Sequence, residues 1–225
     1  MTATVLAGGQ PLTLLPQKAA FLAATATLLV ADAHIGKAVS FRALGVPVPR
    51  GTTSETLAGL DALVAATGAR RIVFLGDFLH SARAHAAATL AALATWRRAN
   101  AGLALVLVRG NHDTRAGDPP AGLGIEVVAE PYLHGGFALC HHPRPRAGSY
   151  VLAGHLHPCL RLGGRPFDRL RLPCFWLGDA VGVLPAFGAF TGMMDIRPGP
   201  GERVFPIAGS SVAELRAPTR EPCAA

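Results

Sequence analysis

The stretch LLVADAH, residues 28–34, shows the pattern on which this sequence is built: a short apolar run that ends directly in polar residues. Such a run is typical of a buried strand, which we expect over residues 27–31. Four more apolar runs end in the same way, at Asp77, Asn111, His141–His142 and His155–His157. Because ligands gather at the carboxyl ends of strands in open sheets, the five ends predict one shared crevice.

The remaining pattern alternates strands and helices in the first half. Residues 52–55 (TTSE) have the form of a capping box, which predicts a helix to about Ala66. A second helix is expected over 84–99, and the other expected strands are 71–75, 103–108, 137–140, 150–152, 169–177, 182–186 and 204–207. We therefore predict an α/β fold with a β-rich second half, plausible as two sheets packed face to face with helices outside.

The bulk composition fits a single domain. The chain has 225 residues, of which 50% are hydrophobic, and we expect one domain over 1–216 followed by a flexible tail over 217–225. The longest apolar run near the start, 19–31, is too short to span a bilayer. The opening MTAT lacks the charged start of a signal peptide, and the four cysteines form no CxxC pair. We predict a cytoplasmic protein without a membrane segment and with reduced thiols.

The positive charge of the chain is almost entirely arginine. The net charge is +7, and Lys18 and Lys37 are the two lysines. Arginine grips phosphate with two hydrogen bonds at once, although a GC-rich coding bias gives the same excess without a function. Arg109, Arg115 and Arg144 stand beside the polar strand ends. Their position favours a polyanionic substrate, and we predict that they contact it.

The polar residues at the strand ends have the composition of a metal site. Two carboxylates, an amide and several imidazoles suit Mn, Fe, Zn or Co better than Ca, which prefers oxygen alone. His155 and His157 stand two apart, so both rings lie on one side of an extended chain. Each piece alone could be an ordinary turn or cap. The ordered set favours a metal site.

As a set, these motifs resemble the signature of the calcineurin-like metallophosphoesterases. They are D-A-H at 32–34, G-D-F-L-H at 76–80, G-N-H-D at 110–113, H-H-P at 141–143 and G-H-L-H at 154–157. Residues 32–53 and 174–192 are also similar to the bacterial ligase-associated DNA-damage-response nucleases. The resemblance implies two mixed sheets packed as a sandwich flanked by helices, and two divalent metal ions, with Mn favoured and Zn or Fe as alternatives.

The same resemblance implies a role for each ligand. Asp77 would bridge both metals. One metal would be completed by Asp32, His34 and His157. The other would be completed by Asn111, His155 and His141. The pattern leaves His142 open as the alternative to His141, because a strand that ends one residue later would turn His142 inward.

A metal-bridging hydroxide would then attack phosphorus in line with the leaving oxygen. The resemblance gives His112 the roles of phosphate contact and general acid. Asp113 would either orient His112 or cap the following turn.

The leading function is phosphodiester cleavage by a DNA nuclease in DNA repair. Its substrate partner would be DNA, and its protein partners a DNA ligase, an exonuclease or a helicase. The alternatives are a phosphoesterase acting on a small nucleotide, a cyclic nucleotide or a phosphorylated lipid precursor, and a catalytically dead scaffold.

Overall fold

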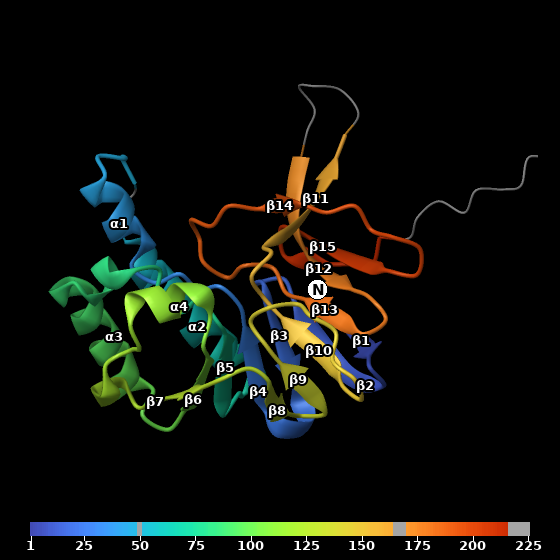
Figure 1. Ribbon diagram of the computed structural model, residues 1–225, viewed down its shortest axis with the longest axis horizontal. Helices are drawn as coiled ribbons and strands as arrows, with labels where there is room; N and C mark the ends of the chain where they lie inside the picture. Colours follow the sequence, from blue (N-terminus) through green and yellow to red (C-terminus); the bar gives the residue numbers. More distant parts are fainter. Residues whose placement is uncertain (49–50, 164–169, 216–225) are drawn as a thin grey trace, which may run out of the picture.

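Two β-sheets packed face to face form the body of the protein (Figure 1). The computed structural model describes residues 1–48, 51–163 and 170–215. The tail predicted over 217–225 therefore lies outside the described residues, as does the last residue of the predicted domain. The predicted class, an α/β sandwich of two mixed sheets flanked by helices, is confirmed.

The first sheet has seven strands in sequence order. They are β1 (Ala3–Ala7), β2 (Gln10–Leu15), β3 (Ala19–Leu22), β4 (Thr27–Val30), β5 (Arg71–Leu75), β6 (Ala104–Val108) and β7 (Ile125–Val128). β1 to β4 form an antiparallel meander, and β4 to β7 run parallel. The ends of β4, β5 and β6 therefore meet at one edge of the sheet.

The second sheet has nine strands along the path β14-β11-β12-β13-β10-β9-β8, with β15 paired to β12 and β16 to β15. They are β8 (Tyr132–His134), β9 (Phe137–Leu139), β10 (Tyr150–Ala153), β11 (Pro158–Leu162), β12 (Leu170–Leu177), β13 (Val181–Val183), β14 (Met194–Asp195), β15 (Arg203–Ala208) and β16 (Ser211–Val212). β9, β10 and β13 are parallel, so this sheet also gathers strand ends at one place.

The helices are α1 (Lys37–Ala43), α2 (Thr52–Thr67), α3 (Ala87–Ala99) and α4 (Asn111–Ala116), with short 3-10 turns at Ala23–Thr25, Ala82–His85 and Ala121–Leu123. α2 and α3 cover the outer face of the first sheet (Figure 1). No helix in the described part of the chain is both long and apolar enough to cross a membrane.

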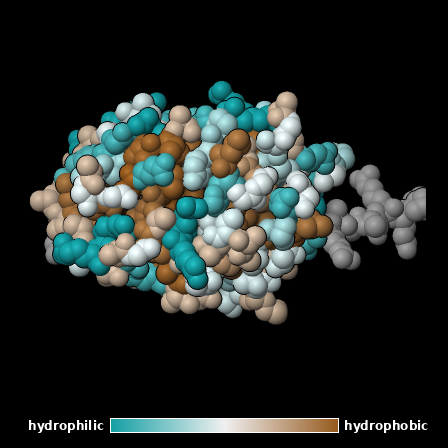
Figure 2. Space-filling view, turned by 90° about the horizontal axis from the view of Figure 1, so that it is seen from below, coloured by the Kyte–Doolittle hydropathy of each residue, from teal (hydrophilic) through white to brown (hydrophobic). Residues whose placement is uncertain are grey.

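Two apolar clusters hold these layers together. One lies between the sheets and includes Leu29, Val73 and Phe175, and the other packs α2 and α3 on the first sheet. Neighbouring residues of one strand serve both clusters, since Leu28 faces the helices and Leu29 faces the second sheet. On the face in Figure 2, hydrophobic side chains lie in separate areas among hydrophilic ones. The high apolar content thus builds the interior.

The predicted strands are found with small shifts at their ends, and the predicted capping box is wrong. Thr52 is the first helical residue rather than the cap, and Gly51 precedes the helix in the left-handed conformation without a side-chain cap. The Thr56 hydroxyl donates to the Thr52 carbonyl oxygen within the first turn. The second predicted helix begins instead as the 3-10 turn at 82–85 and restarts at Ala87.

Candidate metal centre

All seven predicted ligands converge at the facing edges of the two sheets. Asp32, Asp77 and Asn111 follow β4, β5 and β6, whereas His141 and His155 follow β9 and β10. Backbone bonds hold the loops side by side: the His34 amide donates to the Asp77 carbonyl oxygen at 2.9 Å. The fold therefore brings strand ends from both halves of the chain, with their polar residues, to one site.

The backbone at these residues is strained. Seven non-glycine residues in the described chain have positive φ, and five of them are predicted ligands: Asp32, His34, Asp77, His155 and His157. Such residues cost free energy in the left-handed region and persist where the surrounding structure demands it, which happens mostly at functional sites. The fold therefore tolerates a cost in folding free energy at these five positions, which places their side chains in the site.

One side of the site is formed by Asp32, His34 and His157, whose ligand atoms lie within 4.8 Å of one another. The His157 Nδ1–H donates to the Gly192 carbonyl oxygen at 3.0 Å, which leaves Nε2 as an acceptor. That Nε2 lies 3.4 Å from Asp32 Oδ1, itself an acceptor. Both atoms are buried and have no hydrogen-bond partner. Two buried polar atoms that face each other without a hydrogen-bond partner fit a site for a cation.

The other side is formed around His141, which is fully buried. Its Nδ1–H donates to the Leu75 carbonyl oxygen, so its Nε2 is again an acceptor. Nε2 lies 2.9 Å from Asn111 Oδ1, 3.5 Å from Asp77 Oδ1 and 3.0 Å from His155 Nδ1. Burial lowers the pKa of His141, so the ring is neutral and ready to coordinate a metal.

Asp77 lies between the two sides. Its Oδ1 faces His141, as above, and its Oδ2 lies 3.9 Å from His34 Nε2. Burial raises the pKa of this carboxyl, and the neighbouring Asp32 raises it further. Burial also lowers the pKa of His34, to about 2. A buried pair of carboxylates surrounded by neutral imidazoles lacks positive charge, and divalent metals would supply it.

The structure separates His141 from His142. His142 is partly exposed, and its Nδ1 lies 3.0 Å from Glu130 Oε1. The Glu130 carboxylate also accepts the backbone N–H groups of both histidines, at 2.8 and 3.0 Å. Glu130 thus fixes this turn with His141 inward, which favours His141 over His142 as the ligand. No motif in the sequence marked Glu130.

A first prediction concerns Glu130. Glu130→Ala should weaken metal binding by about 10- to 100-fold, as loss of an outer partner of a ligand typically does, because the turn at 141–142 is released. Isothermal titration calorimetry with the metal measures this affinity in the variant and in the wild type. Glu126→Ala, which removes an exposed carboxylate on β7, is the matched control and should bind metal normally. An unchanged metal affinity in Glu130→Ala would refute the role of Glu130 in positioning His141.

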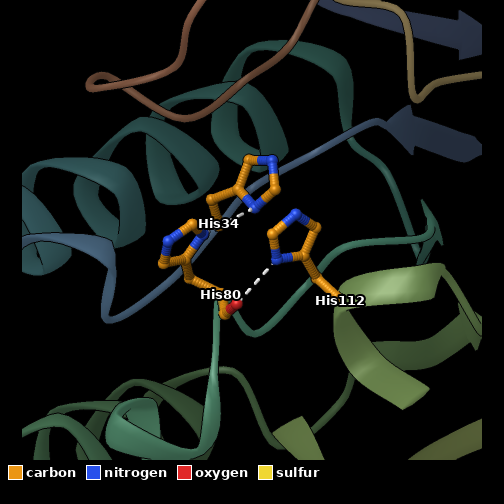
Figure 3. A group of neighbouring side chains, drawn as sticks. All are labelled: His34, His80 and His112. Atoms are coloured by element: carbon orange, nitrogen blue, oxygen red, sulfur yellow. Dashed lines mark hydrogen bonds between the residues drawn. The ribbon is translucent and has the colours of Figure 1, made fainter. Parts of the chain in front are cut away.

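His112 stands at the edge of this site beside His34 and His80 (Figure 3). Its Nδ1–H donates to the His80 carbonyl oxygen at 2.8 Å, so Nε2 is the atom free to hold or give a proton. Nε2 lies 3.9 Å from Asp77 Oδ2, and the side chain is 31% exposed. The His80 ring stacks on His112, and burial lowers the pKa of His80 to about 4.

Asp113 does not orient His112. Its two carboxylate oxygens accept the backbone N–H groups of Leu79 and Gly110, each at 3.0 Å. Of the two expected roles, these contacts favour capping: the His80 carbonyl accepts from the His112 ring, and Asp113, in the first turn of α4, accepts the N–H of the N-cap residue Gly110. Asp113 also ties the loop after β5 to the loop after β6, so it positions two ligand-bearing turns.

The three predicted arginines are all near the surface. Arg109 is committed to an ion pair with Asp118, at 3.0 Å from Nε and 2.7 Å from Nη2. This pair is exposed, so it is worth little and a phosphate could replace Asp118. Arg115 and Arg144 are exposed. Contact of these side chains with a substrate stays a prediction.

A second prediction concerns the close approach at Gly110. A Cβ at this position would lie 2.3 Å from Asp77 Oδ1 and 2.5 Å from the Asp77 amide nitrogen. Gly110→Ala should therefore displace Asp77 and weaken metal binding by at least about 10-fold. Gly122→Ala is the matched control, because nothing lies within 4 Å of its added Cβ. The metal content per folded chain distinguishes the two variants. Equal metal content in both would show that a Cβ at position 110 does not displace Asp77.

This fold and this site define a metallophosphoesterase, a metal-dependent hydrolase of phosphate esters. The chain is 45% identical to the Pseudomonas putida nuclease MPE, with a TM-score of 0.85, over 96% of this chain and 100% of that one. The chain belongs to the family of that protein, and the predicted membership of the calcineurin-like metallophosphoesterases is confirmed.

The chain is also similar to Yfce, a phosphoesterase from E. coli, at 15% identity over 84% of this chain and 97% of that one, with a TM-score of 0.39. No family model and no curated protein matches the sequence.

Proposed function

We propose that the chain is a phosphodiesterase with two divalent metals that cleaves DNA. The convergence of seven ligand side chains, with the unpartnered pair Asp32 Oδ1 and His157 Nε2 among them, is the observation that carries this proposal. The family relationship to a nuclease supports the choice of substrate. The arginine-rich net charge of +7 supports a polyanion.

Asp77 would be the ligand that both metals share. Asp32, His34 and His157 would hold one metal, and Asn111, His141 and His155 the other. When bound, the metals would supply a hydroxide nucleophile at neutral pH and neutralise charge on the phosphoryl oxygens. Mn is the proposed ion, with Zn or Fe as alternatives for the same mixed oxygen and nitrogen ligands.

The protein's own groups would handle the leaving group. His112 Nε2–H would donate a proton to the departing oxygen, since Nδ1 is held by the His80 carbonyl and the ring is open to solvent. Arg109 would bind a flanking phosphate by exchanging Asp118 for it. A role in cytoplasmic DNA repair, beside a ligase, an exonuclease or a helicase, is part of the same proposal.

The test begins with the metal-free protein, reloaded separately with Mn, Zn and Fe. We expect two equivalents per chain by elemental analysis and cleavage of a DNA oligonucleotide that falls steeply as salt rises. A panel of cyclic nucleotides and phosphorylated lipid precursors tests the alternative. Two bound metals with turnover of a small phosphodiester, and none of DNA, would overturn the DNA assignment.

A further inference from the structure

A cavity of about 520 Å³ opens beside the metal centre, lined by Lys37, Phe41, Ala189, Phe190, Thr191 and Gly192. Its lining adjoins the site, because the Gly192 carbonyl oxygen accepts the His157 Nδ1–H at 3.0 Å. On its other wall, the Phe41 ring lies 6.3 Å from the His80 ring. The lining of this cavity therefore contacts one predicted ligand, His157, and the His80 ring beside the site.

Two aromatic rings form the apolar part of the cavity. Phe41 belongs to α1 and Phe190 to the loop after β13, yet their centroids lie 6.1 Å apart in a T-shaped pair. Phe190 is 42% exposed, and among the exposed large apolar side chains of the described residues it is the aromatic one. A ring held at the mouth of a polar site offers a face on which a flat ligand can stack.

The charge of the cavity is positive. Lys37 is the charged residue among the described lining residues, and its Nζ lies 5.7 Å from the Phe41 centroid. An aromatic face beside an ammonium group matches a nucleotide, whose base stacks and whose phosphate pairs with the charge. A second cavity, lined by Trp176, carries the carboxylates Asp179 and Glu202 and would repel phosphate.

We propose that Phe41, Phe190 and Lys37 form a nucleoside subsite, which holds the base of the nucleotide adjoining the scissile phosphate. This inference rests on the proposed function and deepens it. The base would stack on the exposed Phe190 ring, which Phe41 supports in the T-shaped pair, while Lys37 pairs with the flanking phosphate. The subsite would favour cleavage beside a nucleotide that carries a base over cleavage beside an abasic one.

The test compares one single-stranded oligonucleotide with a copy that carries abasic residues on the same backbone. The Mn-loaded wild type should cleave the base-containing strand about 5- to 150-fold faster in kcat/KM, the range expected for stacking one base. Phe190→Ala should lose this preference while retaining its metals and its rate on the abasic strand, and Phe190→Trp should restore it. Leu133→Ala, which truncates an exposed apolar residue on β8, is the control and should keep the preference.

Two outcomes would overturn the inference. If the wild type cleaves both strands equally, or Phe190→Ala keeps the full preference, the subsite is refuted although nuclease activity stands. If the wild type with two bound metals cleaves neither strand, the proposed function fails and the subsite fails with it. The outcomes are distinguishable because the abasic strand reports on phosphodiester cleavage alone.

Discussion

Asp77→Ala is expected to lose bound metal and phosphodiesterase activity together. The side chain is 3% exposed and lies between the two halves of the site, with Oδ1 towards His141 and Oδ2 towards His34. Loss of an outer partner alone typically costs 10- to 100-fold in metal affinity, so loss of a ligand shared by both sides should exceed about 100-fold. Elemental analysis and turnover of bis(p-nitrophenyl) phosphate measure the two effects in one preparation.

Asp77→Asn separates the charge from the shape. Its amide oxygen can still accept the His112 backbone N–H, which Asp77 Oδ1 accepts at 2.9 Å, so the loop should keep its fold. We expect it to lose metal nearly as severely as Asp77→Ala. Asp118→Ala removes an exposed carboxylate paired with Arg109 and should keep both metals. Full metal content in Asp77→Ala would refute the proposed bridge.

The positions of the ligands were predictable because a strand end is a local property. Leu28, Leu29 and Val30 are all buried, so the apolar run predicts a strand without knowledge of its neighbours. The polar residue that follows must then lie at the edge of a sheet. Because β4, β5 and β6 pair in parallel, their three ends lie at the same edge of the sheet.

The family resemblance implied His141, but the local residue pattern could not choose between adjacent residues, because that choice depends on contacts between distant segments. His141 turns inward since Glu130, from the loop after β7, holds the turn, and no local signal marks Glu130. Asp113 was ambiguous for the same reason: its partner Leu79 is distant in sequence. The pairing of Phe41 with Phe190 depends on how the second sheet folds back towards α1.

The first three strands were missed for a different reason. β1 to β3 are short, and the run over 19–31 looks continuous although a 3-10 turn divides it at 23–25. Ala26 adopts a positive φ there, which no residue type announces. The meander is held by packing against the second sheet through Leu12 and Leu14, a contact that local pattern does not encode.

His112→Ala should give the opposite separation from Asp77→Ala: two metals stay bound while turnover of DNA falls by about 10²- to 10⁴-fold, the usual worth of a general acid. The ring's Nδ1–H is held by the His80 carbonyl, and its Nε2 lies 3.9 Å from Asp77 Oδ2, beyond hydrogen-bond distance, so the ligand shell should survive removal of the ring. Nε2 is the proposed proton donor, and the need for its proton depends on the leaving group. An alkoxide leaving from DNA needs it, whereas a nitrophenolate leaves readily as an anion. The loss should therefore be much smaller on bis(p-nitrophenyl) phosphate than on DNA.

Equal losses of turnover on both substrates would assign His112 to phosphate binding instead. Loss of bound metal in His112→Ala would make His112 part of the ligand shell.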